Sequence, residues 1–195
     1  MFEDGASRRD VLRAVGVAIA AGGMTAADAQ HVHEMAAADK AIAGGVYKPK
    51  RFTDHEFATL GTLCEIIVPG AHQGGAAEFI DLLSSQNVEL ATIFTGGLGW
   101  LDERMKSRAG ADFLSARPEQ RTALLDLIAY RANANEDGLG PGVRFFDWAR
   151  RIAVDAYYTS AAGIKEIGYM GNTAVAKFEV PREAVDYALK RSGLA

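Results

Sequence analysis

The chain has 195 residues, a formal net charge of −4 and 49% apolar residues. This length is enough for one globular domain with its own core, and the weakly acidic balance gives no electrostatic reason to bind nucleic acid or an anionic membrane. The single cysteine, Cys64, excludes an internal disulfide, a CxxCH haem attachment and a cysteine-held iron–sulfur cluster within this chain.

The first 29 residues resemble a twin-arginine export signal. A pair of arginines precedes an uncharged run rich in alanine and glycine, and an A-x-A pattern of the kind that signal peptidases cut follows it. The run is shorter than the ~18–20 apolar residues that span a bilayer, so it predicts a removable leader and not an anchor. We therefore expect a protein exported folded to the periplasm by the twin-arginine machinery. The residues that carry this interpretation are Arg8, Arg9, Leu12, Ala27 and Ala29.

Residues 30–50 show no sustained helical period and are interpreted as an N-terminal tail or strap. His31 and His33 form an H-x-H pair that could ligate a metal, but no further ligand stands nearby and a flexible terminus is costly to order. Residues 51–195 are expected to form the domain itself.

Periodicity predicts an all-α domain of about five to six helices joined by long ordered loops. Thr53 and Glu56 form a capping box, and Cys64 falls on the buried stripe of the helix that they begin. A short amphipathic helix follows, with the carboxylates of Glu78 and Asp81 expected to face solvent or a partner. The remaining helices are predicted from Asn87 to before Gly110, from Pro118, over Val143–Tyr158 and over Pro181–Arg191.

Three glycines interrupt the long predicted helix after Asn87: Gly96, Gly97 and Gly99. Each destabilises a helix by roughly 1 kcal/mol relative to alanine. They therefore indicate a kink or the close approach of another backbone, and we favour close packing.

The segment from Tyr157 to Asn172 combines aromatic side chains with bounding glycines and has no helical period. Aromatic residues at the surface are typical anchors of protein interfaces, so we interpret this segment as an ordered loop that contacts a partner. The candidate interface residues are Tyr157, Tyr158, Tyr169, Met170 and Asn172.

No motif for catalysis or for cofactor binding stands out in the chain. Residues 138–142 superficially match a dinucleotide fingerprint, but they follow a helix, and a proline removes an amide that a phosphate would need. The adjacent Asp54, His55 and Glu56 point in different directions on one helical turn and cannot converge on a substrate. The sequence thus predicts no catalytic residue, no metal site and no cofactor in this chain.

Several motifs together resemble the gluconate 2-dehydrogenase subunit 3 family. They are the twin-arginine signal, I-I-V-P-G at the end of the first capped helix, A-E-F-I-D, F-F-D-W-A-R, and Y-Y-T-S followed by G-x-x-x-x-G-Y-M-G-N. The matching residues are Ile67, Pro69, Glu78, Phe79, Ile80, Phe145, Tyr158, Thr159, Ser160, Gly163, Gly168, Tyr169, Gly171 and Asn172. A Ser-Pro helix start often seen in the family is Arg117-Pro118 here.

The resemblance implies a non-catalytic small subunit of a periplasmic dehydrogenase that acts on sugars, sugar acids or polyols. Its expected partner is a flavoprotein large subunit of the glucose-methanol-choline type, which carries FAD and catalysis, with or without a cytochrome c subunit. The small subunit would help the flavoprotein to fold, keep it stable and lend it the export signal. Two alternatives remain open: an autonomous periplasmic enzyme or ligand-binding protein with a pocket near Tyr169 and His72, and a metal or ligand binder that uses the tail containing His31.

Overall fold

A computed structural model describes residues 12, 14, 24–136, 138–169 and 180–193. These residues form eight α-helices, one 3-10 helix and no strand, which confirms the predicted all-α class. The helices are α2 (Ala26–Ile42), α3 (Asp54–Ile67), α4 (Ala76–Gln86), α5 (Val88–Ala109), α6 (Pro118–Ala129), η1 (Arg131–Asn135), α7 (Gly140–Tyr158), α8 (Ala161–Glu166) and α9 (Arg182–Ser192).

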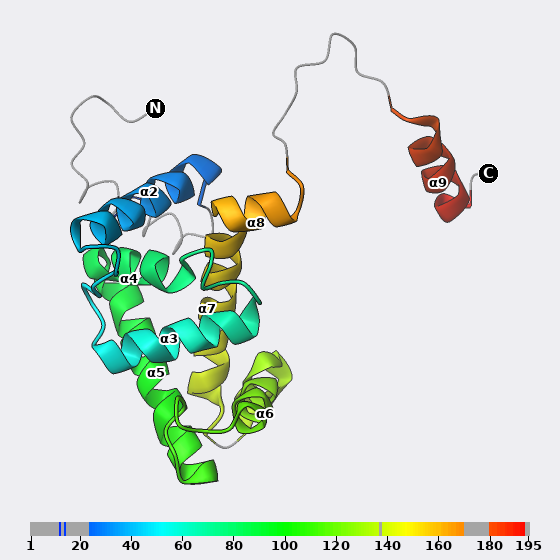
Figure 1. The fold of residues 1–195 in the computed structure, drawn as a ribbon. Helices are drawn as coiled ribbons and strands as arrows, with labels where there is room; N and C mark the ends of the chain where they lie inside the picture. The colour runs from blue at the N-terminus through cyan, green and yellow to red at the C-terminus, as the bar shows by residue number, and fades with distance from the viewer. Residues whose placement is uncertain (1–11, 13, 15–23, 137, 170–179, 194–195) are drawn as a thin grey trace.

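Helix α7 is the centre of the bundle, and it contacts α3, α4, α5, α6, α8 and η1 (Figure 1). Its apolar face is buried as the sequence predicts, because Phe145, Ala149, Ile152 and Ala156 recur at helical spacing and are all inside. Helix α2 lies across α4 at one end of the bundle, and α9 lies apart from it in Figure 1.

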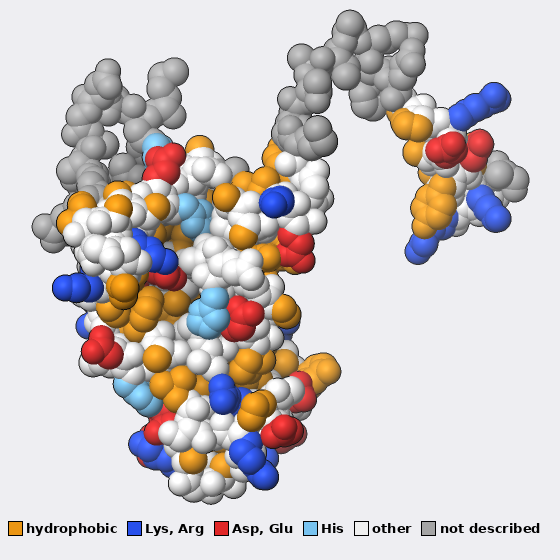
Figure 2. Space-filling view, in the orientation of Figure 1, with side chains coloured by type: hydrophobic (Ala, Val, Ile, Leu, Met, Phe, Trp, Pro, Cys, Tyr) orange, Lys and Arg blue, Asp and Glu red, His pale blue; other side chains and the backbone are white. Residues whose placement is uncertain are grey.

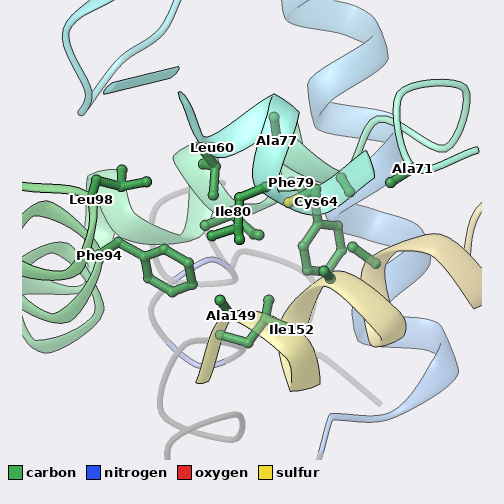
Figure 3. Close-up of a cluster of buried hydrophobic side chains, with 14 of the residues drawn as sticks. Leu60, Cys64, Ala71, Ala77, Phe79, Ile80, Phe94, Leu98, Ala149 and Ile152 are labelled. Atoms are coloured by element: carbon green, nitrogen blue, oxygen red, sulfur yellow. The ribbon is translucent and has the colours of Figure 1, made fainter. Parts of the chain in front are cut away.

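The core is formed where α3, α4, α5 and α7 meet (Figure 3). Phe79 of α4 and Phe94 of α5 are fully buried, and the ring of Phe94 packs edge-on against Phe145 of α7 with 5.7 Å between centroids. Cys64 lies in the same core and is buried, so its interpretation as a small core residue is confirmed. Burial raises the pKa of its thiol to about 12, which makes it a poor nucleophile at neutral pH.

One of the three glycines of α5 is explained by close packing inside the chain. An ideal Cβ on Gly97 would lie 1.9 Å from Cδ2 of Phe145, so α5 and α7 approach each other too closely for any side chain there. Gly96 and Gly99 are different, because both are exposed and a Cβ on either would meet nothing within 4 Å. Packing within the described part of the chain therefore does not account for these two.

Residues 30–50 were interpreted as a tail or strap without helical period, but residues 30–42 are helical and belong to α2 (Ala26–Ile42). Thr25 caps this helix, and Thr25 and Asp28 complete a capping box. The sequence signal was weak because the helix has no strong apolar stripe. The side chains that it buries are small: Ala29 is 0% exposed, and Val32 is also buried.

The predicted helix over Val143–Tyr158 does end at Tyr158, as α7, but the segment after it is more helical than predicted. Ser160 caps the short helix α8 through the amide of Gly163. An ideal Cβ on Gly163 would lie 2.2 Å from the carbonyl oxygen of Tyr157, so this glycine permits the tight turn between the two helices. The connection between α6 and α7 is short, because η1 follows α6 and α7 already begins at Gly140.

Candidate functional site

Asp81 does not face solvent or a partner as predicted, because its carboxylate is fully buried. Oδ2 accepts hydrogen bonds from the hydroxyl of Tyr47 at 2.8 Å and the amide of Lys50 at 2.7 Å. Oδ1 accepts from the amides of Arg51 at 3.0 Å and Phe52 at 3.1 Å. Burial, and then the negative charge of Asp81, raise the pKa of Tyr47. Asp81 therefore fixes the extended strap that joins α2 to α3.

His55 also has a structural role. Its Nε2 lies 2.6 Å from Oδ2 of Asp102 on α5, while Oδ1 of Asp102 accepts the amide of Phe113. The pair ties α3 to α5 and to the connection that leads to α6. A histidine beside a carboxylate is a common catalytic pattern, but both carboxylate oxygens here are used to hold segments of the fold together.

The five candidate interface residues divide into three groups. Tyr157 is 5% exposed, donates a hydrogen bond to Glu166 and packs against Gly74, so its ring is enclosed by this chain and does not present a surface to a partner. Tyr158 and Tyr169 are 40% and 56% exposed, as an interface role requires. Met170 and Asn172 lie outside the described residues.

Arg8 and Arg9 of the predicted export signal also lie outside the described residues, whereas Leu12 is described and buried. At the predicted cleavage pattern, Ala27 is exposed and Ala29 is buried, and both belong to α2. The structure thus places the A-x-A pattern within the first turn of a helix.

A hollow of about 170 Å³ lies between α2 and the loop before α4, and it brings together His33, His72, Lys40 and Glu78. His33 is half-buried, contacts the ring of Phe79, and its Nε2 lies 3.1 Å from the hydroxyl of Thr159. Burial lowers the pKa of His33. Tyr169 does not line this hollow, so the two residues of the predicted alternative pocket, Tyr169 and His72, are not brought together in it.

A groove of about 280 Å³ runs between α5 and α7, and it contains both tryptophans of the chain. Trp100 of α5 lies over Gly142 of α7, where an ideal Cβ would come within 2.3 Å of the indole ring. The guanidinium of Arg151 lies over the ring of Trp148 on α7, 4.1 Å from the ring centroid. The guanidinium of Arg104 lies over the ring of Trp100 in the same way, 5.4 Å from its centroid. The residues that line the groove are Ile93, Gly96, Gly97, Trp100, Pro141, Arg144, Phe145 and Trp148.

The sequence analysis missed this groove, although a signal for it was present. Ile93, Gly96 and Trp100 are spaced by three and four residues and so share one face of the predicted long helix. Arg144 and Trp148 are spaced by four on the helix that packs beside it. The sequence analysis considered only the fully apolar stripes of these helices and assigned no role to Trp100 or Trp148, which are half-buried.

A second hollow, of about 370 Å³, is more apolar and lies between α3, α6 and α7. Figure 2 shows hydrophobic side chains gathered at the surface between α3 and α6, where Ile66, Ile67 and Ala129 line this hollow. Asp126 and Arg150 stand at its edge. The hollow is thus a surface depression with an apolar floor.

Among the described residues, no group of three or more His, Cys, Asp or Glu side chains is arranged to hold a metal ion. None of the helices described is both long enough and apolar enough to cross a membrane.

Comparison with protein families gives one match. The family model described as gluconate 2-dehydrogenase subunit 3 matches residues 54–176, which is well over half of the chain and extends from the start of α3 past α8. The comparisons with curated proteins and with solved structures give no match.

Proposed function

The chain belongs to the gluconate 2-dehydrogenase subunit 3 family, and we propose that it is the non-catalytic small subunit of a periplasmic FAD-dependent dehydrogenase. The substrate class of the complex is sugars, sugar acids or polyols. The observation that carries this proposal is the family match, which covers α3 to α8 and therefore the whole of the bundle around α7.

Several polar side chains are occupied in structural hydrogen bonds, which supports a binding and stabilising role for this subunit. Asp81 is committed to the strap and the His55–Asp102 pair to helix packing. Glu65 accepts the amides of Gly70 and His72, and these two hydrogen bonds lower its pKa. These three carboxylates and His55 are thus engaged in holding segments of the chain in place.

The proposed partner is a flavoprotein large subunit of the glucose-methanol-choline type that binds FAD and carries out the oxidation. The small subunit assists its folding, keeps it stable and takes it through the twin-arginine route, since that route carries folded complexes. Exposed Tyr158 and Tyr169 belong to the proposed contact surface. A cytochrome c subunit is compatible with this arrangement as a third component.

Co-expression with a candidate flavoprotein that lacks its own signal tests the proposal. A tagged full-length small subunit should capture a yellow protein with flavin absorbance, and the pair should reduce an artificial dye when sugar acid is added. The flavoprotein expressed alone should be less soluble and should stay in the cytoplasm. Capture of no flavoprotein, or full export and activity of the flavoprotein without this chain, would contradict the proposal.

The export signal has its own test. Replacing Arg8 and Arg9 together by lysine keeps the charge but removes the pair that the export machinery recognises, so both subunits should accumulate in the cytoplasm. Fractionation followed by immunoblotting of each subunit measures this, and Arg13→Lys is the matched control. Appearance of the large subunit in the periplasm of the double variant would show that it does not depend on this signal.

A further inference from the structure

We propose that the groove between α5 and α7 is the seat of an extended segment of the large subunit, which inserts an apolar side chain beside Trp148 and places a carboxylate against Arg144. This inference rests on the proposed function and adds to Tyr158 and Tyr169 a second contact with the partner, at a separate surface. Three independent features of the groove carry it.

The first feature is the exposure of the two tryptophans. The chain has only two, and both line this one groove while remaining half-buried. Tryptophan and arginine are the residue types most enriched among the dominant contacts of protein interfaces. Arg104 and Arg151 lie over the two indole rings and so hold them in place before a partner arrives.

The second feature is Gly96, a glycine in the middle of a helix that packing within the described residues does not require. Gly97 is needed because Phe145 packs against it, but an added Cβ on Gly96 would meet nothing within 4 Å. Glycine destabilises a helix interior relative to alanine, and one structural reason to keep it is close approach by another backbone. Gly96 is exposed and lines the groove, and no described segment of this chain approaches it, so we assign the approaching backbone to the partner.

The third feature is the charge of the groove. Arg144 is the only ionisable residue among the described residues that line it. Arg144 is exposed, and its guanidinium makes no ion pair with any described residue, whereas the neighbouring Arg150 and Arg131 both pair with Asp147. A cationic groove with an aromatic floor is complementary to an apolar segment that carries an acidic side chain.

The hollow between α3, α6 and α7 is a weaker candidate for the same segment. Asp126 and Arg150 both line it, so it carries one negative and one positive side chain and does not favour a partner segment of either charge. The groove between α5 and α7 is the more selective surface.

The test measures the dissociation constant between the full-length small subunit and the purified flavoprotein large subunit for three groove variants. Trp148→Ala removes the aromatic wall, Arg144→Glu reverses the charge, and Gly96→Gln fills the groove without disturbing the core. Each should weaken binding about tenfold or more. Gly99→Gln, on the same helix but outside the groove, and Lys48→Glu, on the exposed strap, are the matched controls and should change binding less than about twofold.

The Gly96→Gln variant separates binding from folding. Glutamine is a better helix former than glycine, so the isolated variant should melt at the same temperature as the wild type or higher while its binding falls. A loss of binding accompanied by a lower melting temperature would assign the effect to folding and would overturn the inference. Failure of the wild type to bind the flavoprotein would refute the proposed function as well, whereas wild-type affinity in all three groove variants would refute the groove alone.

The tryptophans give a second readout that needs no mutation. Small subunit labelled with 5-fluorotryptophan should show two ¹⁹F resonances, and both should shift when the unlabelled large subunit is added. Gluconate alone, used as a small anionic probe, should leave them in place. Shifts with gluconate, or no shift on formation of the complex, would exclude a partner segment in the groove.

Discussion

Replacing Asp81 by asparagine tests whether the buried carboxylate holds the strap between α2 and α3. The carboxylate accepts four hydrogen bonds, from Tyr47, Lys50, Arg51 and Phe52, two on each oxygen. An amide has a single oxygen, so in either orientation its NH₂ group would face two donors. Hydrogen bonds to charged groups contribute about 1.5–3 kcal/mol each. Because the hydrogen bonds from the amides of Lys50 and Arg51 are only part-buried, water can replace them in part, and we expect a loss near the lower bound for two such bonds, about 3 kcal/mol.

Urea unfolding of the isolated subunit, followed by circular dichroism, measures this loss. About 3 kcal/mol is a large share of the ~5–15 kcal/mol that typically stabilises a domain, so the midpoint should fall clearly at an unchanged slope. Tyr47→Phe removes only one of the four donors and should cost about 1–2 kcal/mol. The carboxylate does not hold the strap if the free energy of unfolding of Asp81→Asn lies within ~1 kcal/mol of the wild-type value. The same conclusion follows if Tyr47→Phe lowers the free energy of unfolding more than Asp81→Asn does.

Gly97→Ala should destabilise the fold by about 1–3 kcal/mol or more, because its Cβ would collide with Phe145. Gly99→Ala should instead stabilise the fold by up to ~1 kcal/mol. Urea unfolding of both variants measures these changes in the free energy of unfolding, and changes of the same sign would contradict the packing of Gly97 against Phe145. Burial lowers the pKa of His33, so its neutral form stabilises the fold above the unfolded-state pKa of ~6.5 and this contribution is lost as the pH falls through the lowered value. The melting temperature should therefore fall more steeply between about pH 7 and about pH 5 in the wild type than in His33→Gln, and parallel curves would exclude the effect. Cys64 should react with a thiol reagent at mildly alkaline pH only after urea unfolding, since burial raises its pKa to about 12; a disulfide-linked band with the partner on a non-reducing gel would be the contrary result.

The helices with strong local signals could be predicted from the sequence. Thr53 and Glu56 begin α3 with the expected capping box, Pro118 is the first residue of α6, and Gly110 ends α5 in a left-handed conformation. Each of these signals acts through neighbouring residues alone. Cys64 was also assigned correctly, because it shares a stripe with apolar residues at helical spacing.

The errors concern residues whose role depends on segments distant in the sequence. Asp81 was placed at the surface because an amphipathic pattern cannot show that residues 47–52 cross over that face of α4. Tyr157 was expected to be exposed, but it is enclosed by the loop that contains Gly74 and by Glu166. Helix α2 was missed because it packs through small alanines, which give almost no periodic contrast.

If residues 1–29 are a removable leader, as the sequence predicts, the position of Ala29 inside α2 makes its removal compete with folding. If the leader is cut after Ala29, the bond that breaks lies one turn into a capped helix and beside a residue that is 0% exposed, so the first turn must open before a peptidase can reach it. The cut removes Thr25 and Asp28 and leaves a new ammonium group at the positive end of the helix dipole, both of which weaken α2. The uncut precursor is then the more tightly closed form. A partner that holds α2 shut would slow its processing, and the rate of leader removal would report how often that turn opens.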